Sequence, residues 1–124
     1  MYEILGRVNK IRGVRGSLVM GKDGIVVASD IAADVRDESV AAVASQVLGS
    51  LQGALKRMAL GAFSRFVVTG SKGRIVMLDA GAALLIVLLE PDVNMGLVTV
   101  ELRHARDQVK VKTQLPGDRQ AKAE

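Results

Sequence analysis

The stretch SRFVVTGSKGRIVMLDAGAALLIVLLE (64–90) contains three apolar runs joined by short connections that contain glycine. The runs at 64–69, 74–79 and 83–90 are rich in valine, isoleucine and leucine, which is typical of β-strands. Connections this short favour hairpins, because parallel strands need a much longer crossover between them. We therefore predict a three-stranded antiparallel meander over this part of the chain.

A second pair of strands is predicted upstream, at 17–21 and 25–29, around the turn Lys22-Asp23-Gly24. An Asp-Gly dipeptide between β-branched runs favours a hairpin, here with a type I′ turn in which both central residues have positive φ. The spacing of Gly16, Gly21 and Lys22 also matches most of the phosphate-binding loop pattern G-x-x-x-x-G-K-[ST]. Such a loop must open into a helix that presents its N-terminus to the phosphates, whereas a strand follows here. We therefore interpret the stretch as a hairpin and not as a nucleotide site.

Apolar residues at helical spacing predict three helices, at 2–14, from the acidic residues at 34–38 to about Leu60, and at 94–112. We expect Gly61 to stop the long second helix. One broad face of that helix is predicted to be apolar and comprises Val40, Val43, Ala44, Val47, Leu48, Leu51, Leu55 and Met58.

The predicted strands are apolar on both faces of the pleat, since Leu18 and Met20 alternate with Val19 and no polar residue interrupts 84–89. Helices must then cover both faces of the sheet. We predict an α/β (α+β) fold, an α/β/α sandwich around a five-stranded antiparallel sheet, in the order α-β-β-α-β-β-β-α. The predicted domain spans 1–112, and the polar segment 113–124 is predicted to be a disordered C-terminal tail.

The composition restricts the classes of function. The chain has 124 residues, of which 49% are hydrophobic and none is cysteine, as expected for one globular domain without disulfides or thiol chemistry. The longest apolar run, 80–89, is too short to span a bilayer, and the first residues lack the apolar core of a secretory signal. We therefore predict a cytoplasmic protein without membrane insertion. The net charge is +4, but Tyr2, Phe63 and Phe66 are too few aromatic residues for a base-stacking surface, so we predict no nucleic-acid binding.

The residues that carry chemistry do not form a convincing site. His104 stands between Arg103 and Arg106, without the ligands that a metal needs. The carboxylates of Asp30, Asp34, Asp37 and Glu38 gather at the entrance of the long helix, where capping explains them better than a catalytic acid–base pair. We predict no catalytic, cofactor-binding or metal-binding residue, no cofactor and no enzymatic activity.

Two features predict contacts with other proteins. Opposite the apolar face of the long helix lie small and polar residues, namely Ala42, Gly49 and Gly53 with Ser45 and Gln46 beside them. Each glycine inside the helix costs about 1 kcal/mol of helix stability relative to alanine. Either this cost is simply tolerated, or the glycines mark a bend in the helix, or they allow a second surface to approach closely. The run SRFVVT (64–69) would, as an edge strand, offer unpaired backbone groups to a partner strand.

The order of elements and several local patterns resemble the roadblock / dynein light chain (roadblock/LC7-type) family, in a bacterial or archaeal MglB-like form. The similarity runs from Ile4 to Val109. It is carried by IRGVRGSLVMGKDGIVVAS (11–29), AAVASQVLGSLQGAL (41–55), FVVTGSKGRIVML (66–78) and LLIVLLEPDVNMGLVTVELRHA (84–105). The N-x-G-L entry to the last helix, at Asn94, Gly96 and Leu97, makes the combination more specific than any single motif.

The resemblance implies a profilin-like fold that forms a homodimer, with the third strand paired edge to edge and the long helices together on one side. The dimer interface that it implies comprises Arg65, Phe66, Val67, Val68 and Thr69 of the strand and Val43, Val47, Ser50 and Ala54 of the helix. It also implies a regulatory or scaffolding role toward a small Ras-like GTPase. The residues that would face this GTPase are Ala42, Ser45, Gln46, Gly49, Gly53, Lys56 and Arg57.

Two points stay open at the level of sequence. Arg36 and Arg57 are available as arginine fingers, but nothing identifies a residue that enters the active site of a partner, so we expect an effect on the switch loops of the GTPase instead. The alternative function is a profilin-like sensory domain for a small ligand, which requires a pocket between sheet and helix with some polar groups. The uniform alanine, valine and leucine content favours a filled core.

Overall fold

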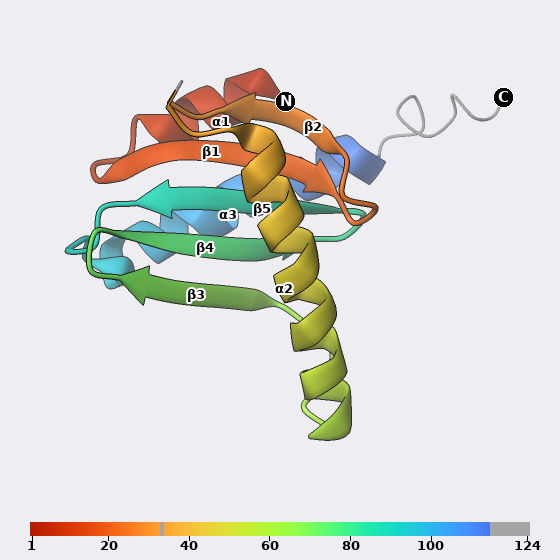
Figure 1. Cartoon of the computed structure of the whole chain (residues 1–124). Coiled ribbons are helices and arrows are strands. Elements are labelled where there is room, and N and C mark those ends of the chain that lie inside the picture. Colours follow the sequence, from red (N-terminus) through yellow and green to blue (C-terminus); the bar gives the residue numbers. More distant parts are fainter. Residues whose placement is uncertain (33, 115–124) are drawn as a thin grey trace, which may run out of the picture.

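The computed structural model describes residues 1–32 and 34–114. Within these residues, helices cover both faces of one sheet (Figure 1). In chain order the elements are α1 (Tyr2–Asn9), β1 (Val14–Gly21), β2 (Val26–Asp30), α2 (Asp37–Arg57), β3 (Arg65–Gly70), β4 (Gly73–Ala80), β5 (Ala83–Leu89) and α3 (Met95–Gln114). This is the predicted order α-β-β-α-β-β-β-α, which is thereby confirmed.

The five strands form one antiparallel sheet in the order β2-β1-β5-β4-β3. The central strand β5 joins the N-terminal hairpin to the later meander by pairing with β1, for example Leu18 with Ile86. Helix α2 crosses one face of the sheet, while α1 and α3 lie on the other (Figure 1). The predicted α/β/α sandwich is therefore confirmed.

Each face of the sheet has its own apolar layer. Under α1 and α3, the side chains of Leu5, Val87 and Leu102 lie in a cluster that is almost free of solvent. Under α2, the cluster is smaller and includes Leu18, Ile86 and Leu48. Burial of one such side chain contributes about 1.5–3 kcal/mol, so both layers stabilise the fold.

The first helix is shorter, and the first strand longer, than the sequence predicts. Helix α1 ends at Asn9, and tight turns carry the chain to Gly13, which has a φ of +92°. A Cβ at Gly13 would collide with Cγ2 of Val93, so only glycine fits where the chain reverses. Strand β1 then begins at Val14, and its register against β5 shifts between Val14 and Gly16. Because of this irregularity, the start of the strand does not show the alternation of apolar and polar residues by which strands are recognised in a sequence.

The predicted type I′ turn at Lys22-Asp23-Gly24 is wrong, although the hairpin is confirmed. Gly24 has a φ of +88°, but Asp23 does not have positive φ. The amide of Gly21 donates to the carbonyl of Ile25 at 2.8 Å, and the Asp23 carboxylate accepts from the amide of Ile25 at 3.0 Å. The loop thus has three residues, with glycine alone in the left-handed position, a common alternative to the two-residue turn.

The two long helices also end differently from the prediction. Helix α2 ends at Arg57, and the left-handed residue in the turn that ends it is Ala59; Gly61 also has positive φ but follows two residues later. Helix α3 continues through Thr113 and Gln114, the first two residues of the predicted tail. The rest of that tail lies outside the described residues.

Candidate protein-interaction surface

Strand β3 forms one edge of the sheet and is a regular strand. It pairs with β4 without a shift of register, from Arg65 opposite Leu78 to Gly70 opposite Gly73. Within the described ranges β3 has no strand on its other side, so the backbone N–H and C=O groups along that side are available. The side chains of Arg65, Val67, Val68 and Thr69 are exposed, and that of Phe66 is half-buried. A straight edge with β-branched residues is well suited to pairing with a further strand.

The opposite edge, β2, is less suited to pairing. Its register against β1 shifts so that Val27 is an extra residue, which is a β-bulge. The end of β2 is also tied to α1, because Nδ2 of Asn9 donates to the carbonyl of Asp30 at 2.8 Å. Asn9 in turn accepts a hydrogen bond from the buried Ser17 hydroxyl. A bulge and an adjacent helix are both devices that protect an edge strand from association.

The sheet covers only part of the apolar face of helix α2. Figure 1 shows its C-terminal turns extending past β3, beyond the edge of the sheet. Ala41, Ala44 and Leu48 are buried, whereas Val43 is 57% exposed and Met58, predicted on the apolar face, is 59% exposed. The predicted interface residues Val43, Val47, Ser50 and Ala54 form a stripe along one flank of α2, and each retains exposed surface.

This flank and β3 form one surface, which we call the β3–α2 surface. Phe66 and Val68 lie opposite Met77 and Ile75 in the register and therefore share the sheet face that α2 covers. Val67 lies opposite Val76, on the face of α1 and α3. Leu60, which is 64% exposed just beyond the end of α2, was not singled out from the sequence. The available signal was a large apolar residue in the short link between a helix and an edge strand.

The predicted GTPase-facing residues lie along α2, most of them on its exposed side. Gly49 is open, since a Cβ there would meet no atom within 4 Å. The Gly53 position is partly covered, because a Cβ would lie 3.4 Å from Nη1 of Arg57. Ser45 is half-buried against the β1–β2 turn, where its Oγ lies 3.1 Å from the position of a Cβ on Gly24. The exposed residues of this set are Ala42, Gln46, Gly49, Lys56 and Arg57.

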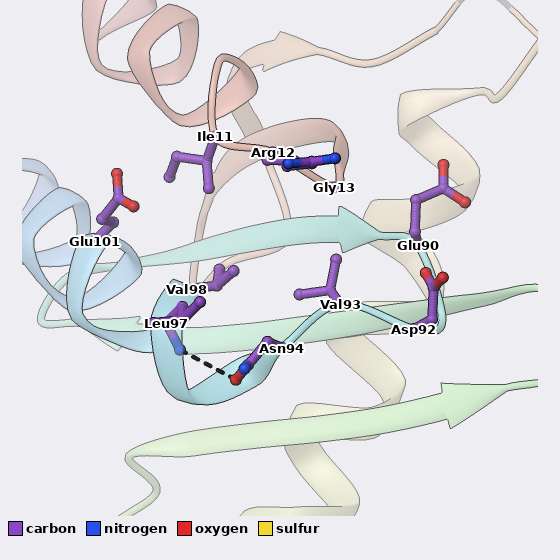
Figure 2. Close-up of a pocket in the computed structure, with 10 residues that line it drawn as sticks. All are labelled: Ile11, Arg12, Gly13, Glu90, Asp92, Val93, Asn94, Leu97, Val98 and Glu101. Atoms are coloured by element: carbon purple, nitrogen blue, oxygen red, sulfur yellow. Dashed lines mark hydrogen bonds between the residues drawn. The ribbon is translucent and has the colours of Figure 1, made fainter.

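The cleft in Figure 2, of about 540 Å³, relates to the alternative of a small-ligand sensor. It lies where the α1–β1 link, the β5–α3 link and the start of α3 meet, and not within either apolar layer. Ile11, Val93, Leu97 and Val98 give it apolar walls.

The acidic groups of this cleft include Glu90, whose Oε2 accepts from Nε of Arg15 at 3.0 Å. Asn94 caps α3 there, since its Oδ1 accepts from the amides of Gly96 and Leu97. Polar groups of the cleft such as Glu90 and Asn94 therefore already form hydrogen bonds within the protein.

The histidine and the carboxylates that the sequence suggested for chemistry lie on different elements. His104 is exposed on α3, while Asp37 opens α2 and accepts from the amide of Glu38. Lys22, of the apparent phosphate loop, forms an ion pair with Asp79 at the end of β4. In the parts of the chain that the structure describes, no three His, Asp or Glu side chains could hold a metal ion together. No described helix is long and apolar enough to cross a membrane.

Comparison with known proteins decides the family. The model of the Roadblock/LC7 domain matches residues 1–90. The chain belongs to the Roadblock/LC7 domain family. The uncharacterized protein MJ0310 of Methanocaldococcus jannaschii is 36% identical over 107 residues, which cover 86% of this chain and 94% of MJ0310.

Several solved structures, among them a Roadblock/LC7 domain and a profilin, share the fold. MglB of Myxococcus xanthus superposes with a TM-score of 0.84 at 18% identity, over 90% of this chain and 86% of MglB. The Roadblock/LC7 domain from Streptomyces avermitilis gives a TM-score of 0.84 at 17% identity, over 93% and 98% of the two chains. LokiProfilin2 in a complex with rabbit actin gives a TM-score of 0.60 at 11% identity, over 89% and 95%. The profilin-like character of the fold is thereby confirmed.

Proposed function

We propose that this Roadblock/LC7 protein is a homodimer in which two β3 strands pair edge to edge and two α2 helices lie together on one side. The observation that carries the proposal is the regular, unpaired edge of β3 beside the exposed flank of α2. The bulge in β2 supports β3 as the pairing edge. Pairing would also bury apolar side chains such as Val43 and Val68 that the single chain leaves exposed.

We further propose that the dimer binds a small Ras-like GTPase in the cytoplasm and modulates its activity or position, without enzymatic activity of its own. Membership in the family supports this role, since GTPase regulation is what the resemblance to roadblock proteins implies. The outer side of α2 supports it as well. An open glycine such as Gly49 allows another backbone to approach closely, and Lys56 and Arg57 add positive charge at one end.

The edge of β3 can be tested with Val68→Asp, for which Val27→Asp is a matched control. The two valines are 48% and 50% exposed and occupy opposite edge strands. A carboxylate at Val68 would be buried without a partner in the dimer, whereas one at Val27 would stay in water. We expect light scattering after size exclusion to show dimers for the wild type and for Val27→Asp, and monomers for Val68→Asp. A monomeric wild type at all concentrations would contradict the proposed dimer.

The wild type and the same two variants also test whether the protein binds a small Ras-like GTPase. The probe is the small Ras-like GTPase encoded nearest to this chain in its genome, loaded with GDP or with a non-hydrolysable GTP analogue. We expect the wild type and Val27→Asp to bind it and Val68→Asp to bind more weakly, because the dimer presents two α2 helices. If none of the three binds in either nucleotide state, while a small molecule remains attached to the wild type in native mass spectrometry, the sensory alternative replaces the proposal.

A further inference from the structure

Three arginines, one of them the first residue of β3, surround a hollow on the α3 side of the sheet, the face opposite to α2. The hollow has a volume of about 410 Å³ and is lined by Ser64, Arg65, Leu78, Arg103 and Arg106. Arg65 is the first residue of β3 and lies opposite Leu78 of β4 in the register. Arg103 and Arg106 lie one helical turn apart on α3. The site is thus built on two strands and a helix.

The positive charges of Arg65 and Arg103 in this hollow are not balanced by an acidic residue of its walls. None of the residues that line it is acidic. Across residues 1–32 and 34–114, the guanidinium groups of Arg65 and Arg103 form no hydrogen bond and no ion pair. Like charges that share a hollow repel each other, so an anion placed between them would be favourable.

The third arginine is already held in place. Nε of Arg106 donates to Oδ1 of Asp107 at 2.7 Å, and its Nη1 lies 3.5 Å from the carbonyl of Asp79. The side chain is only 23% exposed. Its Nη2 has no hydrogen-bond partner among the described residues. Little conformational entropy remains for this side chain to lose on binding, which favours its use as a fixed donor.

We propose that this hollow is a binding site for a phosphate monoester or free phosphate. A phosphate of this kind carries close to two negative charges and three strong acceptor oxygens. The guanidinium groups of Arg65 and Arg103, each able to donate two parallel hydrogen bonds, Nη2 of Arg106 and the Ser64 hydroxyl match that number of acceptors better than they match a single carboxylate. Pairing of β3 in a dimer would use the backbone groups of Arg65, whereas its side chain lines the hollow on the α3 side of the sheet, so the site does not require the dimer proposed above.

The test follows the Nε–Hε signals of the arginines by NMR in the full chain, while inorganic phosphate is added at constant ionic strength. We expect saturable shifts for Arg65, Arg103 and Arg106. Arg103→Gln should weaken phosphate binding roughly tenfold, because it removes one charged hydrogen-bond donor. Arg12→Gln is the control, since Arg12 is also exposed but lies at the cleft of Figure 2.

The source of the phosphate is distinguished by a second titration with O-phosphoserine. Tighter binding of O-phosphoserine than of inorganic phosphate assigns the site to a phosphorylated side chain of a partner, and equal or weaker binding assigns it to free phosphate. Arg103 is exposed, so its substitution should leave the melting temperature unchanged. Shifts that do not saturate, or that are the same in Arg103→Gln and Arg12→Gln, overturn the proposal.

Discussion

Ala59 is a single residue in a conformation that normally belongs to glycine. It has a φ of +56° and follows the last turn of α2. The amide of Leu60 donates to the carbonyl of Leu55 at 3.0 Å, and that of Ala59 to the carbonyl of Lys56 at 3.2 Å. These two bonds form the Schellman motif that ends many helices, in which the left-handed residue is usually glycine.

We therefore expect Ala59→Gly to stabilise the protein by about 1 kcal/mol, because the Cβ penalty of the left-handed conformation is removed. Ala42→Gly, in the exposed interior of α2, should instead destabilise it by about 1 kcal/mol. The free energy of unfolding in urea measures both changes. If the two variants shift it in the same direction, Ala59 does not have the conformation described here.

At the scale of elements, the two sides of α2 differ in the residues that they need. Its inner side needs apolar residues to cover the sheet, and Ala44 and Leu48 supply them. Its outer side carries Gly49, where a Cβ would meet no atom of a neighbouring element within 4 Å. The cost of an interior glycine is therefore not explained by packing inside this chain.

Gly49→Leu distinguishes the effect of the outer side of α2 on binding from its effect on folding. We expect it to maintain or increase the melting temperature, because leucine is a better helix former and the position is open. Binding of the small Ras-like GTPase should weaken at least about tenfold if that partner contacts the glycine, since the added side chain holds the two surfaces apart. Lys112→Leu, on the exposed surface of α3, is the control. Unchanged affinity would exclude Gly49 from the contact.

At the scale of the whole molecule, the proposed dimer would contribute to stability. A dimer that unfolds to separate chains has a melting temperature that rises with protein concentration. We expect a rise of several degrees over about a hundredfold range of concentration for the wild type, and none for Val68→Asp. Differential scanning calorimetry measures both. A wild-type melting temperature independent of concentration would indicate that association adds nothing to the fold.

Much of the fold could be predicted because local signals agreed with the tertiary structure. The apolar run at 83–89 could only be a buried strand once short turns flanked it, and β5 is indeed central. Two details failed for different reasons. The turn depends on a local side-chain contact that the Asp-Gly pattern does not reveal, since the Asp23 carboxylate accepts from the amide of Ile25. The start of β1 depends on residues distant in sequence, because it is set by pairing with Leu88 and Leu89. The order of strands, and so the identity of the two edges, was not contained in any local pattern.

The extra residue at Val27 has a consequence for the size of any assembly. A sheet with two equally receptive edges could add copies head to tail without end, as fibrils do. Here one edge is regular and the other is interrupted by the bulge, so a copy that joins through β3 presents only interrupted edges outward. Association through the strands then closes at a symmetric pair. The bulge would thus keep an aggregation-prone architecture soluble, and repair of the register at Val27 would be a route to polymerisation.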